Sequence, residues 1–153
     1  MKKTTQLLTT LVFLSLSIFI SCGGSDPVDI DTRDAQGVLA SGTFNENGVS
    51  VDGGTREEWE GFSITMSYNV DTDQGTFSSS GAPTNDGAAD VWPSSGTWTF
   101  GGAAGAPDVT TIMRSDGVEM TAGISATALT LGFTIPDAGG RTFDGDWSFA
   151  FNK

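Results

Sequence analysis

Few side chains in this protein could take part in chemistry, and most of those are carboxylates. The sequence holds 19 acidic residues, one cysteine and no histidine. The lack of histidine excludes Ser-His-Asp and Cys-His nucleophilic sites as well as histidine-ligated zinc and haem sites. What remains is the thiol of Cys22 and pairs of acids, which can hydrolyse a substrate only when burial raises the pKa of one carboxyl group.

Two groups of acids are close enough in the sequence to form such a pair. They are Glu57, Glu58 and Glu60 around Trp59, and Asp144 with Asp146. Asp144 and Asp146 lie on one face of a predicted strand, and the aromatic residues of that strand lie on the opposite face. We therefore expect both aspartates to face water. We therefore predict a protein that is not an enzyme, with a carboxylate-based hydrolase as the least favoured alternative.

An acidic turn raises the question of a calcium site. Asp71-x-Asp73-x-Gly75 resembles the opening of an EF-hand loop, but that loop needs a glycine and a later glutamate where this chain has Thr76 and Ala82. Aspartate is also frequent in turns because its side chain bonds to nearby backbone. We predict no metal and no cofactor.

Cys22 directly follows a segment with the features of an export signal. Lys2 and Lys3 precede a largely apolar stretch, 7–20, and Ser21 stands before the cysteine. A charged start, a short apolar stretch and a small residue before the cut describe a secretory signal peptide. The stretch is shorter than the roughly 20 residues that cross a bilayer. We predict that residues 1–21 are removed.

The position of Cys22 resembles the lipobox of bacterial lipoproteins, although Phe19 and Ile20 stand where leucine and a small residue are usual. The resemblance implies diacylation of the thiol, cleavage before Cys22 and often a third acyl chain on the new amino group. Two or more chains anchor a protein stably to a membrane. The alternatives are that Cys22 is the last residue of an ordinary signal or a stray thiol. An odd thiol is unusual in an exported protein, because an oxidising compartment invites intermolecular pairing.

Residues 22–37 are predicted to form a flexible acidic tether. Glycine and serine follow the cysteine and leave the backbone loose, and the aspartates that come next repel one another. Because Gly23, not aspartate, follows Cys22, the lipoprotein resemblance implies the outer membrane. The early acids are similar to the surface-export signal of Bacteroidota lipoproteins, so we expect the protein to face the periplasm or the cell surface. A plain solvated linker is the alternative reading of these acids.

The charge of the mature chain limits its partners. Removal of 1–21 takes two lysines and no acids, which leaves five basic residues against 19 acids and a net charge of −14. Such a surface repels nucleic-acid phosphates and anionic headgroups. We therefore exclude nucleic acid and expect membrane attachment through the lipid on Cys22. Residues 38–153 have the size of one domain with one core, which we expect to be monomeric.

The elements of this domain show a period of two. The clearest predicted strands are 61–70, 127–135 and the C-terminal strand with Phe143, Trp147, Phe149 and Phe151 on one face. Weaker strands are predicted at 38–44, 75–80, 96–101, 109–114 and 117–124, and a single helical turn at 55–60. The breaks are short and include the hairpin signal Asp116-Gly117. We predict an all-β fold, an antiparallel up-and-down meander of about eight strands that forms a small barrel or curved sandwich.

Part of this pattern resembles a known family. The segment 92–100 with Gly96 and Trp98, together with the later Leu129 and Leu131, resembles the Gly-x-Trp and leucine-rich strands of lipocalin-like domains in bacterial lipoproteins. The resemblance covers roughly the C-terminal half, and Phe44 stands where the opening motif has tryptophan. It implies an eight-stranded meander with one mouth, which either holds a small ligand or is filled by side chains.

Aromatic residues are the candidates for ligand contact. Trp59 lies among glutamates and Trp92 in a Gly/Ser/Pro-rich loop, which suggests an exposed rim of the barrel for both. The alternative is that they cap one end of the barrel, as loop tryptophans often do. Trp98 and Trp147 are in phase with strand aromatics and are expected in the core. The candidate ligand-binding set is Trp59, Tyr68, Trp92 and Trp98.

Two hypotheses of function remain beside the hydrolase. The first is a lipid-anchored, non-catalytic binding module for a small apolar molecule or a glycan. The second is a structural or accessory lipoprotein that docks on an outer-membrane or secreted protein through a sheet edge or rim. A hollow interior would favour the first, and a filled interior with an exposed apolar strip would favour the second.

Overall fold

The structure is a computed structural model that describes residues 32–84, 87–103, 106–136 and 143–153. The predicted signal peptide, Cys22 and the tether up to residue 31 lie outside the described residues.

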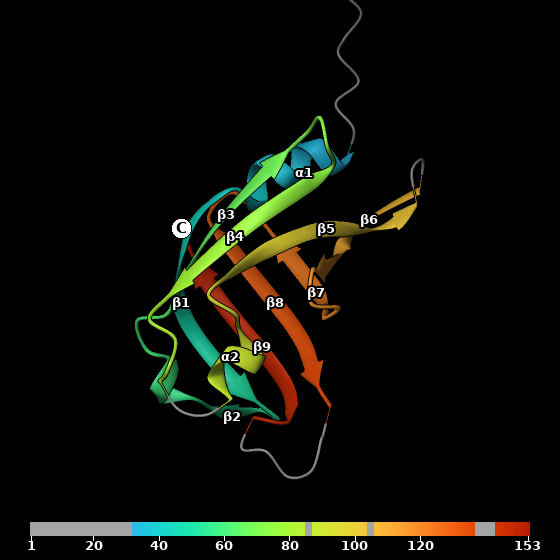
Figure 1. Ribbon diagram of the computed structural model, residues 1–153. Coiled ribbons are helices and arrows are strands. Elements are labelled where there is room, and N and C mark those ends of the chain that lie inside the picture. The colour runs from blue at the N-terminus through green and yellow to red at the C-terminus, as the bar shows by residue number, and fades with distance from the viewer. Residues whose placement is uncertain (1–31, 85–86, 104–105, 137–142) are drawn as a thin grey trace, which may run out of the picture.

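Eight antiparallel strands close into a barrel (Figure 1). With β2 set aside, each strand pairs with the strand that follows it along the chain, and the last strand, β9, pairs with the first, β1. The eight are β1 (Gly42–Val51), β3 (Ser63–Asn69), β4 (Gln74–Ser80), β5 (Ser95–Ala103), β6 (Ala106–Arg114), β7 (Glu119–Ile124), β8 (Ala128–Ile135) and β9 (Gly145–Asn152). A short added strand, β2 (Gly54–Thr55), pairs with the end of β1. The predicted all-β meander is confirmed, and closure pairs strands that would otherwise be exposed edges.

The alternation of apolar and polar residues determines which face of each strand points inward. In β8, Leu129, Leu131 and Phe133 are buried while Thr130 and Thr134 are exposed. Burial of one such apolar side chain contributes about 1.5–3 kcal/mol. A register slip by one residue would expose the whole set, so the inward face fixes the register.

The predicted Asp116-Gly117 hairpin is confirmed. Gly117 has a φ of 90°, a left-handed conformation that favours glycine, and the backbone N–H of Arg114 donates to the carbonyl of Val118 at 2.9 Å. The turn joins β6 to β7 directly.

Short helices close the two ends of the barrel. α1 (Thr32–Ala40) contacts β3 as well as β6 and β7, so it crosses one opening. At the opposite end lie the 3₁₀ turn η1 (Glu57–Trp59) and α2 (Ala88–Val91), which place Trp59 and Val91 in the core. Figure 1 shows α1 and α2 at opposite ends.

α1 is the main departure from the sequence-based prediction, which placed tether up to residue 37 and a strand from residue 38. The helix is held by distant partners, since Arg33 bonds to β5 and the backbone at Gly37 lies against Tyr68. No local periodicity signals such contacts, because the partners are far along the chain. α2 was not predicted either, whereas η1 confirms the helical turn predicted at 55–60.

Candidate functional site

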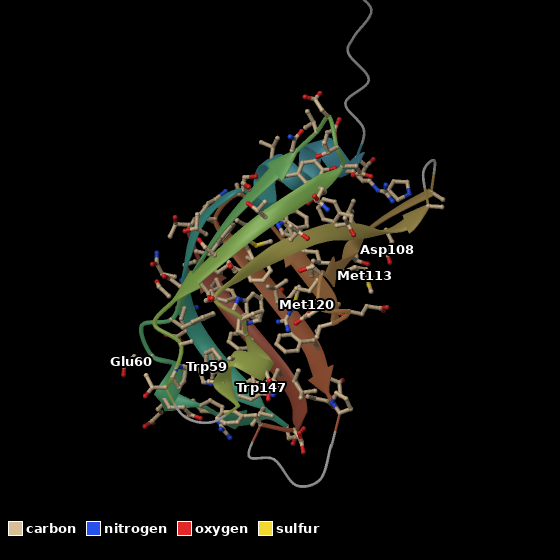
Figure 2. All side chains as sticks on the ribbon, in the orientation of Figure 1. Trp59, Glu60, Asp108, Met113, Met120 and Trp147 are labelled. Carbon is tan, nitrogen blue, oxygen red and sulfur yellow. The ribbon has the colours of Figure 1, made fainter. Side chains whose placement is uncertain are left out.

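Trp59 and Trp92 do not stand at an exposed rim. Their exposed fractions are 0% and 1%, and both rings pack against Phe149, with centroids 5.1 and 5.4 Å away. Figure 2 shows Trp59 and Trp147 inside the barrel, whereas Glu60 points outward. The prediction that Trp59 and Trp92 form exposed ligand platforms is therefore wrong. η1 and α2 turn these indoles inward because burial of so large an apolar surface stabilises the fold.

Tyr68 and Trp98 lie at the other end of the barrel, beneath α1. With Phe100 they form a cluster that we call the aromatic shelf, with ring centroids 5.1 to 5.7 Å apart. The indole N–H of Trp98 donates to the carbonyl of Thr76 at 3.2 Å. The hydroxyl of half-buried Tyr68 donates to the carboxylate of Asp73, and burial together with this bond raises the pKa of Tyr68 above its usual range.

Aromatic side chains pack against one another in the described interior between these two clusters. Phe149 stacks on Phe133 and on Trp147, with ring centroids 5.8 Å apart in each pair. The largest fully buried side chains are those of Trp59, Trp92, Trp98, Trp147, Phe44, Phe62, Phe149 and Phe151. Two hollows that described residues line open on the outer surface.

The larger hollow, of about 320 Å³, lies on the outer side of β7, β8 and β9. We call it the β7–β9 hollow. It is lined by Glu119, Thr121, Gly132, Phe133, Thr134, Asp146 and Trp147.

The β7–β9 hollow forms where the barrel wall divides. Pairing of β7 with β8 ends at Thr121 and Gly132, while β8 continues beside β9 as far as Ile135. Gly132 adds no side chain at this point. A Cβ atom there would meet only the backbone oxygen of Trp147, at an ordinary distance of 3.8 Å.

The lining of the β7–β9 hollow is rich in hydrogen-bonding groups. The hydroxyl of Thr134 donates to the carboxylate of Asp146 at 2.7 Å, and Glu119 and Thr121 are exposed beside them. Carboxylates accept several hydrogen bonds, and hydroxyls both donate and accept. Such a lining suits a ligand with many hydroxyl groups. Asp146 faces water as predicted, whereas Asp144 is half-buried.

The second hollow, of about 230 Å³, surrounds Arg56. Arg56 pairs with Glu58 at 2.5 Å, and its guanidinium lies 5.4 Å from the ring centre of Trp147. The three candidate glutamates near Trp59 are all exposed, and Glu57 and Glu60 line this hollow beside the arginine. An acid for hydrolysis needs burial to raise its pKa, so this arrangement offers no argument for catalysis.

The acidic turn at 71–75 connects β3 to β4. The carboxylate of Asp73 there accepts hydrogen bonds from Arg33 and Tyr68. Within the described ranges, no group of three or more acids or cysteines is arranged to hold a metal ion.

Sequence reasoning missed the residues of the β7–β9 hollow. Glu119, Thr121 and Thr134 are ordinary outward positions of three strands, and only the register brings them together. The one available signal was Gly132, because a glycine inside a strand often marks a site where something approaches closely.

None of the helices in the described segments is both long and apolar enough to cross a bilayer. Comparisons of the chain with protein-family models, with curated proteins and with solved structures give no match.

Proposed function

We propose that the protein is an extracytoplasmic glycan-binding module, held at the outer membrane by lipid on Cys22, and that the sugar binds in the β7–β9 hollow. The observation that carries this proposal is the hollow itself. Its volume of about 320 Å³ suits one or two sugar rings. Its carboxylates and hydroxyls supply the polar contacts that orient such a ligand.

The packed aromatic side chains of the interior argue against an apolar ligand inside the closed barrel. The core aromatic rings are in mutual contact, and eight of the largest side chains are less than 2% exposed. A ligand there would have to displace close-packed side chains. Of the two ligand classes suggested by the sequence, the glycan therefore fits the outer surface better.

The position of the hollow fits attachment at Cys22. The hollow uses the first residues of β7 and β9 and the last residues of β8, whereas α1 leads into the start of β1, beside the end of β9. The hollow thus lies toward the end of the barrel away from α1. A tether entering at α1 leaves it open to the surroundings.

The acidic lining of the β7–β9 hollow indicates which kinds of glycan would bind there. Glu119 and Asp146 line the hollow, and its lining includes no basic residue. Together with the acidic balance of the chain, this disfavours uronic or sialic acids and favours neutral sugars or amino sugars.

Filling the hollow tests the proposal. Gly132→Val places a β-branched side chain on an outward strand position without a steric clash. With Cys22→Ser as the soluble background, an oligosaccharide panel should show binding that Gly132→Val abolishes. Gly54→Val on β2, outside the hollow, should leave binding intact. An absence of binding to every neutral and amino sugar would refute the proposal.

The packed aromatic interior also favours the second candidate, docking on a protein partner. At the hollow, residues 133–135 of β8 extend beyond the pairing with β7, and such a strand edge can bind an extended peptide. This role predicts a protein complex that Gly132→Val disrupts and that soluble oligosaccharides do not displace.

A further inference from the structure

The exposed large apolar side chains of the protein lie at one end of the barrel. Within the described ranges they are Val38, which is 65% exposed, and Val70, which is 50% exposed. Val38 lies on α1, and Val70 begins the turn between β3 and β4. This turn and α1 are neighbours, because Asp73 of the turn pairs with Arg33 of the helix (Figure 1).

The outer face of α1 has the opposite polarity to that of an ordinary surface helix. The helix buries Arg33, Gly37 and Ala40, whereas Ala35 and Val38, about one turn apart, are exposed. A surface helix normally turns its apolar side chains toward the core and its charged side chains toward water. We call Ala35, Val38 and Val70 the outer patch.

Polar contacts hold α1 on the barrel and so fix the position of the outer patch. Arg33 forms an ion pair with Asp73 and donates to the carbonyl of Gly101 at 2.9 Å. At the other end of the helix, the ammonium group of Lys153 donates to the carbonyl of Leu39 at 2.9 Å. Whatever the outer patch binds therefore also orients the barrel.

The acyl chains predicted on Cys22 are close to this end of the barrel along the chain. Residues 22–31 connect the cysteine to α1, and ten residues span at most about 35 Å. An anchored barrel thus keeps its α1 end beside the bilayer. The effective concentration of lipid at the outer patch is then high, so a contact too weak to hold a free protein suffices.

We propose that the outer patch contacts the phospholipid surface that carries the anchor and holds the barrel with its α1 end toward the membrane, a contact that depends on the lipid anchor of the proposed function. Amphipathic helices lie in the membrane interface with their apolar face at the boundary of headgroups and acyl chains. The β7–β9 hollow lies toward the opposite end and is held away from the bilayer.

The charges beside the outer patch indicate a zwitterionic rather than an anionic lipid surface. Asp34 lies on α1, and the exposed Asp71 follows Val70 directly. Carboxylates at the interface repel anionic headgroups. The contact therefore depends on burial of apolar side chains, and anionic lipid should weaken it at low salt.

Quenching by brominated phosphatidylcholine tests the contact. Because acylation blocks the thiol of Cys22 in the lipidated protein, Val38→Cys, Val70→Cys and Glu60→Cys each supply a single free thiol for an environment-sensitive dye. Brominated vesicles should reduce the fluorescence of dyes at residues 38 and 70 to about half of its value on plain vesicles, because the patch reaches the acyl boundary. Glu60→Cys is the matched control: Glu60 is exposed and points outward near the other end (Figure 2), so its dye should be quenched little.

A second measurement tests whether the two valines make the contact. With the dye on Ala35→Cys, the combined substitutions Val38→Asn and Val70→Asn should lower the quenching several-fold, while the protein still sediments with the vesicles. Val38→Leu keeps an apolar side chain at the same position and should retain the quenching.

The outcomes separate this contact from the anchor. Protein that sediments with the vesicles but shows equal quenching, or none, at residues 38, 70 and 60 overturns the contact and leaves the anchor standing. Protein that does not sediment overturns both. If the dye at residue 38 becomes shielded as the protein concentration rises without lipid, a second copy of the chain covers the patch, which also overturns the proposal. Glycan binding enters none of these measurements.

Discussion

The guanidinium of Arg114 lies 5.2 Å from the ring centre of Trp92, on the inner side of the barrel. Its side chain is fully buried and also donates to the carbonyl of Val91 at 2.8 Å and to the carboxylate of Asp116. One arginine thus joins β6 to α2 and to the β6–β7 turn. Cation–π contact and charged hydrogen bonds act together there.

We expect Arg114→Ala to lower the free energy of unfolding by roughly 2–3 kcal/mol, because it leaves the buried carbonyl of Val91 without its donor and opens a gap beside Trp92. Urea denaturation measures the loss. Arg56→Ala is the matched control: its partly exposed pair with Glu58 should contribute only about 1 kcal/mol or less. Equal losses in the two variants would contradict the role given to Arg114.

Asp116 should make folding stability depend on pH in the acid range. Hydrogen bonds from Arg114 hold the pKa of Asp116 below its usual range. A carboxyl group with a lowered folded-state pKa stabilises the fold above its unfolded pKa of about 3.9, and this contribution is lost as the pH falls through the folded value.

The stability of Asp116→Asn should consequently fall less steeply than that of the parent chain below about pH 4. Some slope should remain, because hydrogen bonds from Thr110 and Thr111 also lower the pKa of Asp108. Thermal unfolding at a series of pH values measures both slopes. If stability falls equally steeply with pH in Asp116→Asn and in the parent chain, Asp116 does not cause this pH dependence.

The four tryptophans should be shielded from solvent in the native protein. Their exposed fractions are between 0% and 2%. We expect acrylamide to quench native fluorescence several-fold less efficiently than fluorescence of the urea-unfolded chain. Efficient native quenching would support the rim positions that the sequence suggested for Trp59 and Trp92.

Lipidation of Cys22 is tested by mass spectrometry of the membrane-bound product. The expected mature form begins at Cys22 and carries acyl chains, and Cys22→Ala should abolish acylation and membrane attachment. Ser25→Ala, three residues later, should change neither. A bare thiol, or a product released into the medium, would refute the anchor.

The predictability of each element depended on where its stabilising partners lie. β8 could be predicted because Leu129, Leu131 and Phe133 recur with a period that the sequence displays directly. α1 could not be predicted, because Arg33 bonds to the turn between β3 and β4 and to the hairpin of β5 and β6, which lie much later in the chain. Trp59 was misplaced because its acidic neighbours indicate exposure, although they point outward while the indole points inward.

The residues of the β7–β9 hollow were even harder to predict from the sequence. Asp146 faces outward as its place in the sequence pattern predicts, and the structure shows that Glu119 and Thr134 are exposed too. Their convergence depends on the register of β7, β8 and β9 and on the end of β7–β8 pairing at Gly132. Register follows from the packing of all the inward residues together, and so no single strand reveals it.

Charge in the β7–β9 hollow provides the most direct test of ligand class. Asp146→Asn keeps the acceptor for the hydroxyl of Thr134 and removes the negative charge, so the free energy of unfolding should change by less than about 0.5 kcal/mol. If Asp146 accepts hydrogen bonds from the sugar, affinity should fall about tenfold to hundredfold, because a hydrogen bond to a charged acceptor contributes roughly 1.5–3 kcal/mol. Calorimetric titration measures this change, and Glu60→Gln, an exposed carboxylate outside the hollow, is the control. If Asp146→Asn binds as tightly as the parent while Gly132→Val does not bind, shape rather than charge selects the sugar, and the preference for amino sugars over acidic sugars should be absent.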